Sequence, residues 1–254
     1  MRTALLSAMC GLLLSLSTTA HAQQAWVEGA VRQPGAIALG ADARFLDVLL
    51  VAGPTEEAYP LGGAVLRPSE LAAQQRLKAG LEYDLEALAA TRLPTGIATQ
   101  VPRLQAWLKT LPVTGRIRAD MDPRRLELDR SSNRPAADGD RFVYPRRPRT
   151  IRVVGSVAVP CELAHTPLRE AAGYLRDCTI AAGADRDWVY AIQPDGEVQR
   201  LGIAPWNRSN GQALAPGALV YVPLDERALR EVAPDFNADM AAFLATQYLP
   251  AEAP

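Results

Sequence analysis

The chain has 254 residues, and its 27 basic residues nearly balance its 28 acidic residues. This near-neutral charge argues against nucleic acid as a partner, because proteins that bind nucleic acid use an excess of positive charge. A chain of this length can form one large domain or two ordinary ones.

The N-terminal segment has the pattern of a secretory signal. Arg2 precedes an apolar run over residues 4–16, and the small-x-small sequence Ala20-His21-Ala22 follows it. An uncleaved membrane anchor is the alternative, but a spanning helix needs about 20 apolar residues. We therefore expect residues 1–22 to be a signal peptide that is removed on export. The product would be a periplasmic protein without a transmembrane segment.

Two cysteines, Cys161 and Cys178, remain after removal of the signal peptide. An even pair in an oxidising compartment predicts a disulfide. Closing this short loop would stabilise the fold by about 3 kcal/mol in the chain-entropy model. The alternatives are a reactive thiol or a metal pair. A closed zinc site needs four ligands, and His165 is the only nearby histidine.

The pattern V-x-G-x-V-x-x-P occurs twice, at residues 27–34 and 153–160. In each copy an apolar strand precedes the proline turn, and a returning strand follows it. A helix then ends at Ala-Gly, at residues 52–53 and 182–183. A glycine turn and a late apolar strand follow within residues 137–144 and 215–222. This order predicts a duplicated α+β unit of the β-grasp type.

The second copy carries two further local signals. Thr166-Pro167 combines a hydroxyl cap with a proline at the first helical position, so we expect its helix to begin there. The segments 188–192 and 198–201 flank Pro194-Asp195-Gly196, which predicts a β-hairpin.

A helical insert interrupts the first copy. Leucines from Leu71 to Leu88 and apolar residues from Ile97 to Leu111 recur at helical spacing. The predicted organisation is a first β-grasp domain, a helical insert, a second β-grasp domain and a C-terminal helical segment; these occupy residues 23–68 with 112–147, 69–111, 148–224 and 225–254, respectively.

The C-terminal segment predicts an amphipathic helix over residues 235–249. Its apolar face can dock on the protein's own body, or on a partner or a lipid surface, and we take partner contact as a candidate role. The residues of this face are Phe236, Met240, Phe243, Leu244 and Tyr248.

These features together resemble a known group of proteins. The repeated pattern and the helix that ends in Ala-Gly are similar to the SLBB type of β-grasp found in Wza-like outer-membrane polysaccharide exporters. The order of all segments, including the sequence LPVTGR at residues 111–116, resembles the GfcC family of capsule-biosynthesis proteins. One departure is Cys161, which stands where the first copy has Gly35. If that position needs a positive φ, the second turn must differ from the first.

The resemblance implies a periplasmic accessory protein of capsule or exopolysaccharide biosynthesis and export, without an enzymatic step. Its expected partners belong to the polysaccharide-export machinery, either an outer-membrane exporter or a periplasmic protein. The first alternative is a periplasmic glycan-binding protein that recognises an anionic polysaccharide. The second is a polysaccharide hydrolase or lyase.

The residues themselves also weigh against catalysis. With His21 removed, His165 is the one histidine left for a serine- or cysteine-type mechanism. The sequence contains no glycine-rich phosphate loop of the P-loop or Rossmann type, and we expect no cofactor and no metal. Paired carboxylates for glycoside cleavage stay open, because any two acids can converge in a fold.

Arginines offer the main signal for binding. Eleven arginines and six acids lie between Arg116 and Arg152, which predicts either a surface for anionic polysaccharide or lipid phosphate, or a solvated linker. Arg116 is the principal binding candidate, with a structural salt bridge at a strand edge as its alternative. Trp107 and Tyr144 are candidates for stacking against sugars, and the alternative for each of them is a place in the core.

Overall fold

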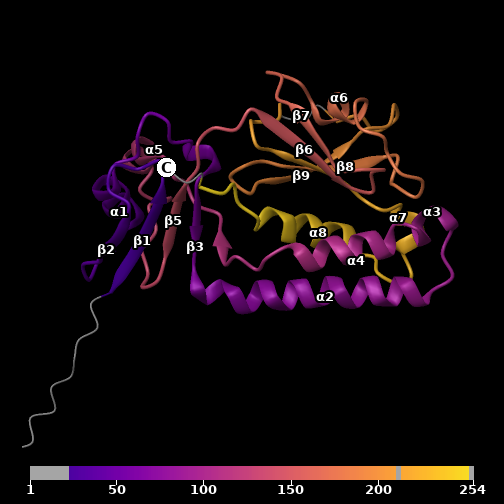
Figure 1. Ribbon diagram of the computed structural model, residues 1–254, viewed down its shortest axis with the longest axis horizontal. Helices are drawn as coiled ribbons and strands as arrows, with labels where there is room; N and C mark the ends of the chain where they lie inside the picture. Colours follow the sequence, from indigo (N-terminus) through magenta and orange to yellow (C-terminus); the bar gives the residue numbers. More distant parts are fainter. Residues whose placement is uncertain (1–22, 210–212, 252–254) are drawn as a thin grey trace, which may run out of the picture.

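The computed structural model describes residues 23–209 and 213–251, so the expected signal peptide lies outside the described residues. The described strands form two five-stranded sheets in a mixed α+β architecture (Figure 1). The helices found in this part of the chain are all too short or too polar to cross a bilayer.

The first sheet has the strand order β2-β1-β5-β3-β4. β1 pairs in parallel with β5, and the other neighbouring strands are antiparallel. Helices α1 (Phe45–Ala52) and α5 (Pro123–Leu128) contribute to the core on one of its faces. Its strands are β1 (Gln24–Gly29), β2 (Gly35–Ala38), β3 (Ala64–Leu66), β4 (Arg116–Ile117) and β5 (Arg141–Tyr144).

The second sheet repeats this topology with the order β7-β6-β10-β8-β9. Its first strand, β6, again pairs in parallel with the last, β10. The predicted hairpin is confirmed as β8 and β9, which pair from Trp188 opposite Gly202 to Ile192 opposite Val198. The strands are β6 (Thr150–Gly155), β7 (Cys161–Ala164), β8 (Trp188–Ile192), β9 (Val198–Gly202) and β10 (Leu219–Val222).

The glycine of the repeated pattern has the same structural role in both copies. Gly29 and Gly155 have φ values of 96° and 93°, in the region that side chains disfavour. A Cβ at Gly29 would lie 2.0 Å from the carbonyl oxygen of Tyr144, and one at Gly155 would lie 2.4 Å from that of Val222. The last strand of each sheet therefore approaches the first strand too closely for any other residue.

The turns after the two prolines differ, as the exchange of glycine for cysteine predicts. Gly35 has a φ of 119°. Cys161, at the matching position, does not have a positive φ, because Leu168 is the one non-glycine residue with a positive φ among the described residues. Cys161 forms the predicted disulfide with Cys178, with a Cα–Cα distance of 6.0 Å. This bond joins β7 to the segment that follows α6 (Ala171–Leu175).

The expected helix start at Thr166-Pro167 is wrong. Helix α6 begins at Ala171, because Leu168 takes a left-handed conformation at φ 61° that a right-handed helix cannot continue. The main chain of Thr166 instead bonds the hydroxyl of Tyr174, which accepts from the Thr166 amide at 2.8 Å and donates to its carbonyl oxygen at 3.2 Å.

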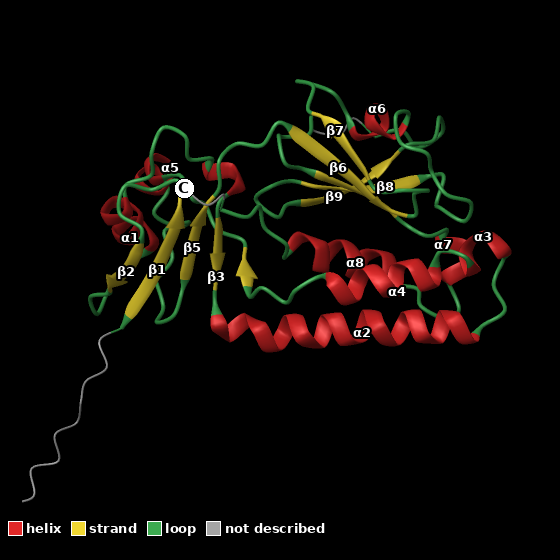
Figure 2. Cartoon of the chain, in the orientation of Figure 1, coloured by secondary structure: helices red, strands yellow, loops and turns green. Residues whose placement is uncertain are grey.

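The helical insert belongs to the first unit in sequence but packs against the second sheet. In Figures 1 and 2, α2, α4 and α8 lie in a layer along one face of that sheet. Their apolar side chains share one core with Val154, Tyr190 and Tyr221. The helices of this layer are α2 (Leu71–Ala90), α3 (Thr95–Ala98), α4 (Val101–Thr110), α7 (Glu226–Leu229) and α8 (Phe236–Ala245).

The second sheet is therefore buried on both faces, which explains its nearly continuous apolar strands. Along β10, Val220 and Val222 face the core beside α6, whereas Leu219 and Tyr221 face the helical layer. The insert also touches the backbone of the second unit, since a Cβ on Gly183 would lie 2.5 Å from the carbonyl carbon of Gly96.

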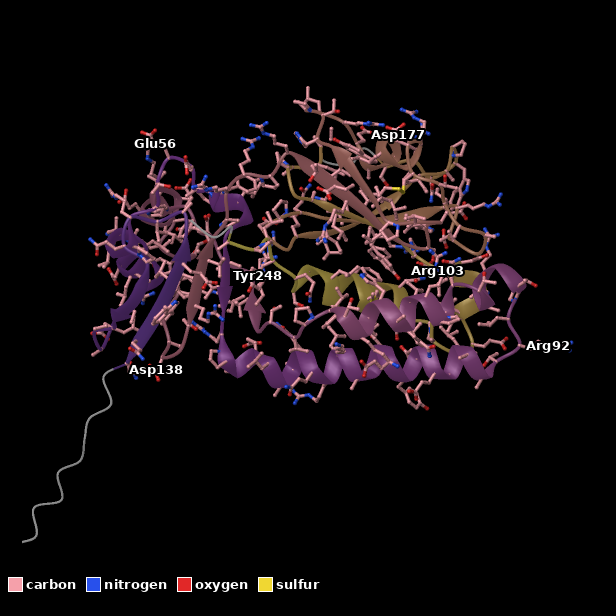
Figure 3. All side chains as sticks on the ribbon, in the orientation of Figure 1. Glu56, Arg92, Arg103, Asp138, Asp177 and Tyr248 are labelled. Carbon is pink, nitrogen blue, oxygen red and sulfur yellow. A yellow bond between two sulfur atoms is a disulfide. The ribbon has the colours of Figure 1, made fainter. Side chains whose placement is uncertain are left out.

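Helix α8 ends earlier than residue 249 and differs from the predicted helix in its exposure. Asn237, which lies off the predicted apolar face, is buried and bonds both the amide and the carbonyl oxygen of Leu224. Tyr248 lies beyond α8 and packs with Ala64, Leu66 and Val143 on the second face of the first sheet. The chain after α8 thus returns to the first unit (Figure 3).

Candidate functional site

A cavity of about 490 Å³ lies where the two units and the helical layer meet. Its wall includes Trp107 at the end of α4, Arg116 on β4, and Ile192 at the end of β8. The segment after α8 closes another side with Tyr248, which is labelled between the first sheet and the helices in Figure 3. Its volume lies within the usual range for a ligand pocket.

Gln74 on α2 holds the main chain that carries Arg116. Its Oε1 accepts from the amide of Gly115 at 2.8 Å, and its Nε2 donates to the carbonyl oxygen of Arg116 at 2.9 Å. Gly115 has a φ of 72°, and a Cβ there would lie 2.6 Å from the carbonyl oxygen of Arg67. The sequence TGR is therefore fixed by a buried amide on one side and by a close backbone approach on the other.

The guanidinium of Arg116 joins three segments through main-chain carbonyls. Nη1 donates to Gln247 at 2.7 Å and to Ala245 at 3.3 Å, both at the end of α8. Nη2 donates to Gly63 at 3.4 Å and to Pro194 in the β8–β9 turn. The predicted alternative for Arg116 is a structural salt bridge. Its side chain does have structural contacts, but the acceptors are main-chain carbonyl oxygens rather than a carboxylate, so the salt bridge itself is wrong.

Burial lowers the pKa of Arg116 to about 10, and the nearby charge of Asp195 acts in the opposite direction. The side chain is still cationic at neutral pH, because that pKa lies well above 7. Within the described residues its Nε has no hydrogen-bond partner. The arrangement therefore places a buried positive charge in the wall of the cavity, where it can attract an anionic group.

The two aromatic candidates occupy different environments. Trp107 is partly buried, packs against the helical layer and lines the same cavity as Arg116. Tyr144 is fully buried in the first unit, and its hydroxyl donates to the carbonyl oxygen of Met121 at 2.6 Å. Burial raises the pKa of Tyr144. Stacking of a sugar on Tyr144 is therefore wrong as a prediction, because no face of its ring is accessible.

Four of the five candidate partner-contact residues are core residues in this structure. Phe236, Met240, Phe243 and Leu244 are at most 4% exposed and pack in the core shared with α2 and α4. They cannot touch a partner while α8 keeps this position. The structure therefore has α8 docked on the protein's own body rather than on a partner.

Four of the eleven arginines in the arginine-rich stretch form ion pairs with acids of the same chain. Arg118 pairs with Glu197, Arg141 with Glu28, and Arg146 with Glu57. These pairs hold exposed side chains and each contributes little to stability. They favour the reading of a solvated surface over a surface dedicated to anionic ligands.

His165, the one histidine among the described residues, is also engaged. His165 contacts the carbonyl oxygen of Leu214 through Nε2 at 2.9 Å. Among the described residues, no three metal-ligating side chains lie together in a way that could hold a metal ion. Sequence reasoning missed Gln74, whose helical position among leucines shows no sign that its amide reaches Gly115.

Residues 160–249 match the family model described as the C-terminal part of the capsule-biosynthesis protein GfcC. This part of the chain, about a third of its length, is therefore similar to the GfcC family. The residues matched to GfcC include Pro194, Ala245 and Gln247, which supply three of the four carbonyls around Arg116. The resemblance found from the sequence is thereby confirmed.

A curated relative supports the same relationship. The protein of Escherichia coli K12 that bears the name uncharacterized protein YjbG is 30% identical over 153 residues. The aligned part covers 60% of this chain and 62% of the relative, so the match spans about three fifths of the relative's length.

Proposed function

We propose that this protein is a non-catalytic periplasmic accessory protein of capsule or exopolysaccharide biosynthesis and export. The observation that carries the proposal is the family match over residues 160–249, which extends from β7 to the residues beyond α8. It acts through contacts with the polysaccharide-export machinery and with the polysaccharide.

The shared strand order of the two sheets supports their interpretation as tandem SLBB-like β-grasp units. In both, an opening hairpin precedes a helix, and the last strand pairs in parallel with the first.

The disulfide supports the periplasmic location, because disulfides persist in oxidising compartments. It also occupies both cysteines as a structural bond rather than as reactive thiols. The signal peptide remains part of the proposal. Sequencing the N-terminus of the protein recovered from the periplasm tests it, with Gln23 expected as the first residue.

The decisive experiment is a deletion of the gene with quantification of polysaccharide at the cell surface and inside the envelope. We expect less polysaccharide at the surface, restored by the wild-type gene. Unchanged amounts in both fractions would contradict a role in export. Purified protein should also leave the chain length of the isolated polysaccharide unchanged, and shortened chains would favour the hydrolase or lyase alternative instead.

A further inference from the structure

Two tryptophans form an aromatic pair on the second unit, away from the cavity at Arg116, and one of them, Trp206, is exposed while Trp188 is partly buried. Trp206 is 70% exposed, and its ring meets that of Trp188 edge to face, with centroids 6.4 Å apart. Tryptophan is usually well buried on average, so an indole displayed to this extent suggests a contact surface.

The loop that displays Trp206 is fixed by its neighbours. The Asn207 side chain accepts from the amide of Ala204 at 3.0 Å and donates to the carbonyl oxygen of Asp187 at 2.9 Å. Ser209 accepts from the amide of Gly202 at 2.9 Å. Trp206 is therefore presented by an ordered turn, which lowers the entropic cost of binding a ligand against it.

A cleft of about 320 Å³ lies beside the two indoles, and its other wall is the start of the C-terminal segment around α7. Its lining is polar apart from the aromatic pair and a proline, and its volume is at the lower end for ligand pockets. The lining residues are Asp185, Asp187, Trp188, Trp206, Glu226, Arg227, Arg230 and Pro234.

Asp187 is positioned to accept from a ligand. Its Oδ1 accepts from the indole N–H of Trp206 at 3.4 Å, and its Oδ2 accepts from Arg227 at 3.0 Å. Each carboxylate oxygen has two lone pairs, so each can still accept one hydroxyl proton. Asp185 fixes the main chain that carries Asp187, since its carboxylate accepts from the amides of Asp187, Trp188 and Glu226.

The cations of the cleft are not equivalent. Arg227 is paired with Asp187, and Arg200, which stacks on Trp188 at 4.0 Å, is paired with Glu226. Arg230 is exposed and has no ion pair within the part of the chain that the structure describes. Its planar guanidinium can therefore bind a carboxylate of the ligand through two hydrogen bonds.

We propose that this cleft binds one uronic acid unit of an anionic polysaccharide. The apolar face of the sugar ring stacks on Trp206, a ring hydroxyl donates to Asp187, and the sugar carboxylate accepts from Arg230. An apolar ring flanked by a carboxylate and a guanidinium matches a sugar acid better than a protein surface, because the centre of a protein interface is depleted of charged residues. The choice of ligand rests on the proposed function in polysaccharide export.

The test is a titration of the purified protein, followed by the indole N–H signals of its four tryptophans in two-dimensional NMR. The probes are an oligomer of galacturonic acid and a neutral glucose oligomer of the same length. We expect a saturable shift of the Trp206 signal at millimolar galacturonate oligomer. The signal of Trp26, which is also exposed but lies on β1, should not move.

Variants assign the roles of the side chains. Trp206→Ala should weaken binding of both oligomers at least about tenfold. Arg230→Gln should weaken binding of the galacturonate oligomer about tenfold and leave that of the glucose oligomer unchanged. Trp26→Ala and Arg76→Gln, which alter exposed residues on β1 and α2, are the matched controls and should leave both affinities unchanged.

An absent Trp206 shift at millimolar probe would overturn the proposal, as would equal losses in Trp206→Ala and Trp26→Ala. Retained thermal unfolding temperatures show that the variants are folded, and the signal of the wild-type indole does not depend on any variant. The gene deletion separates the two proposals. Saturable binding at Trp206 together with unchanged surface polysaccharide would contradict the proposed function and leave this site standing.

Discussion

Arg116 donates from Nη1 to the carbonyl oxygen of Gln247 at 2.7 Å, and this contact fastens strand β4 of the first unit to the residues that follow α8. The same guanidinium reaches Pro194 in the second unit. One side chain thus holds the first sheet, the second sheet and the end of the helical layer together.

We predict that Arg116→Ala lowers the free energy of unfolding by at least about 3 kcal/mol, because it removes several charge-assisted hydrogen bonds and leaves buried carbonyls without a donor. Arg116→Lys should lose less, since lysine keeps the charge but not the planar set of donors. Urea denaturation measures both. Arg76→Ala, at an exposed position of α2, is the control, and its free energy of unfolding should stay within about 0.5 kcal/mol of wild type. Equal stability of Arg116→Ala and wild type would show that the hydrogen bonds of Arg116 do not stabilise the fold.

The glycines of the repeated pattern should be intolerant of substitution. Gly29→Ala and Gly155→Ala should each cost at least about 2 kcal/mol, because both positions combine a positive φ with a carbonyl oxygen in the place of the Cβ. Gly80→Ala is the matched control. Gly80 lies within α2 with open space around it, so alanine there should stabilise the protein by about 0.5–1 kcal/mol. Thermal unfolding followed by circular dichroism distinguishes the two directions.

Phe243→Ala tests whether α8 is part of the core or a detachable docking element. Phe243 is fully buried, so the substitution should lower the free energy of unfolding by about 3–5 kcal/mol. Leu128→Ala, at a residue that is 89% exposed, should change it by less than about 0.5 kcal/mol. A Phe243→Ala variant as stable as wild type would indicate that α8 spends much of its time away from the body.

Two carboxylates lie on neighbouring helices, Asp84 on α2 and Asp239 on α8, and their ionisation destabilises the fold in a pH-dependent way. Partial burial raises the pKa of both groups, and the charge of Asp239 adds to the shift at Asp84. A raised folded-state pKa means that their contribution to stability is present at low pH and is lost as the pH rises through that pKa.

Asp84→Asn should therefore stabilise the protein at pH 7 and lose this effect near pH 3, where both aspartates are protonated. The gain should stay below about 1 kcal/mol, since both side chains are still partly exposed and water screens their charges. Urea denaturation at the two pH values measures it, with Glu86→Gln on α2 as the control. A gain of equal size at pH 3 would assign the effect to helix propensity rather than to charge.

Sequence patterns captured the local elements of this fold well. The two V-x-G-x-V-x-x-P copies located the opening strands, and Pro194-Asp195-Gly196 located a hairpin, because these turns need particular residues at particular positions. The disulfide followed from compartment and pairing alone.

Long-range placement was beyond the same reasoning. The apolar stripes on α2 and α4 require a partner, but nothing in their spacing states that the partner is the sheet of the other unit. Arg116 could be singled out, yet its four carbonyl partners are distant in sequence and carry no side-chain signature. The exposure of Trp206 depends on how a loop is fixed by Asn207, which is likewise a tertiary property.

The position of the helical insert has a consequence for how the chain acquires its fold. Residues 71–110 are made before the sheet that covers their leucines, so this apolar face stays open to solvent until residues 150–245 have also been made. The helical insert cannot complete its core without the second sheet and α8, so folding must couple contacts that are far apart in sequence. A fragment that ends before the second sheet should therefore aggregate or be degraded rather than accumulate as folded protein.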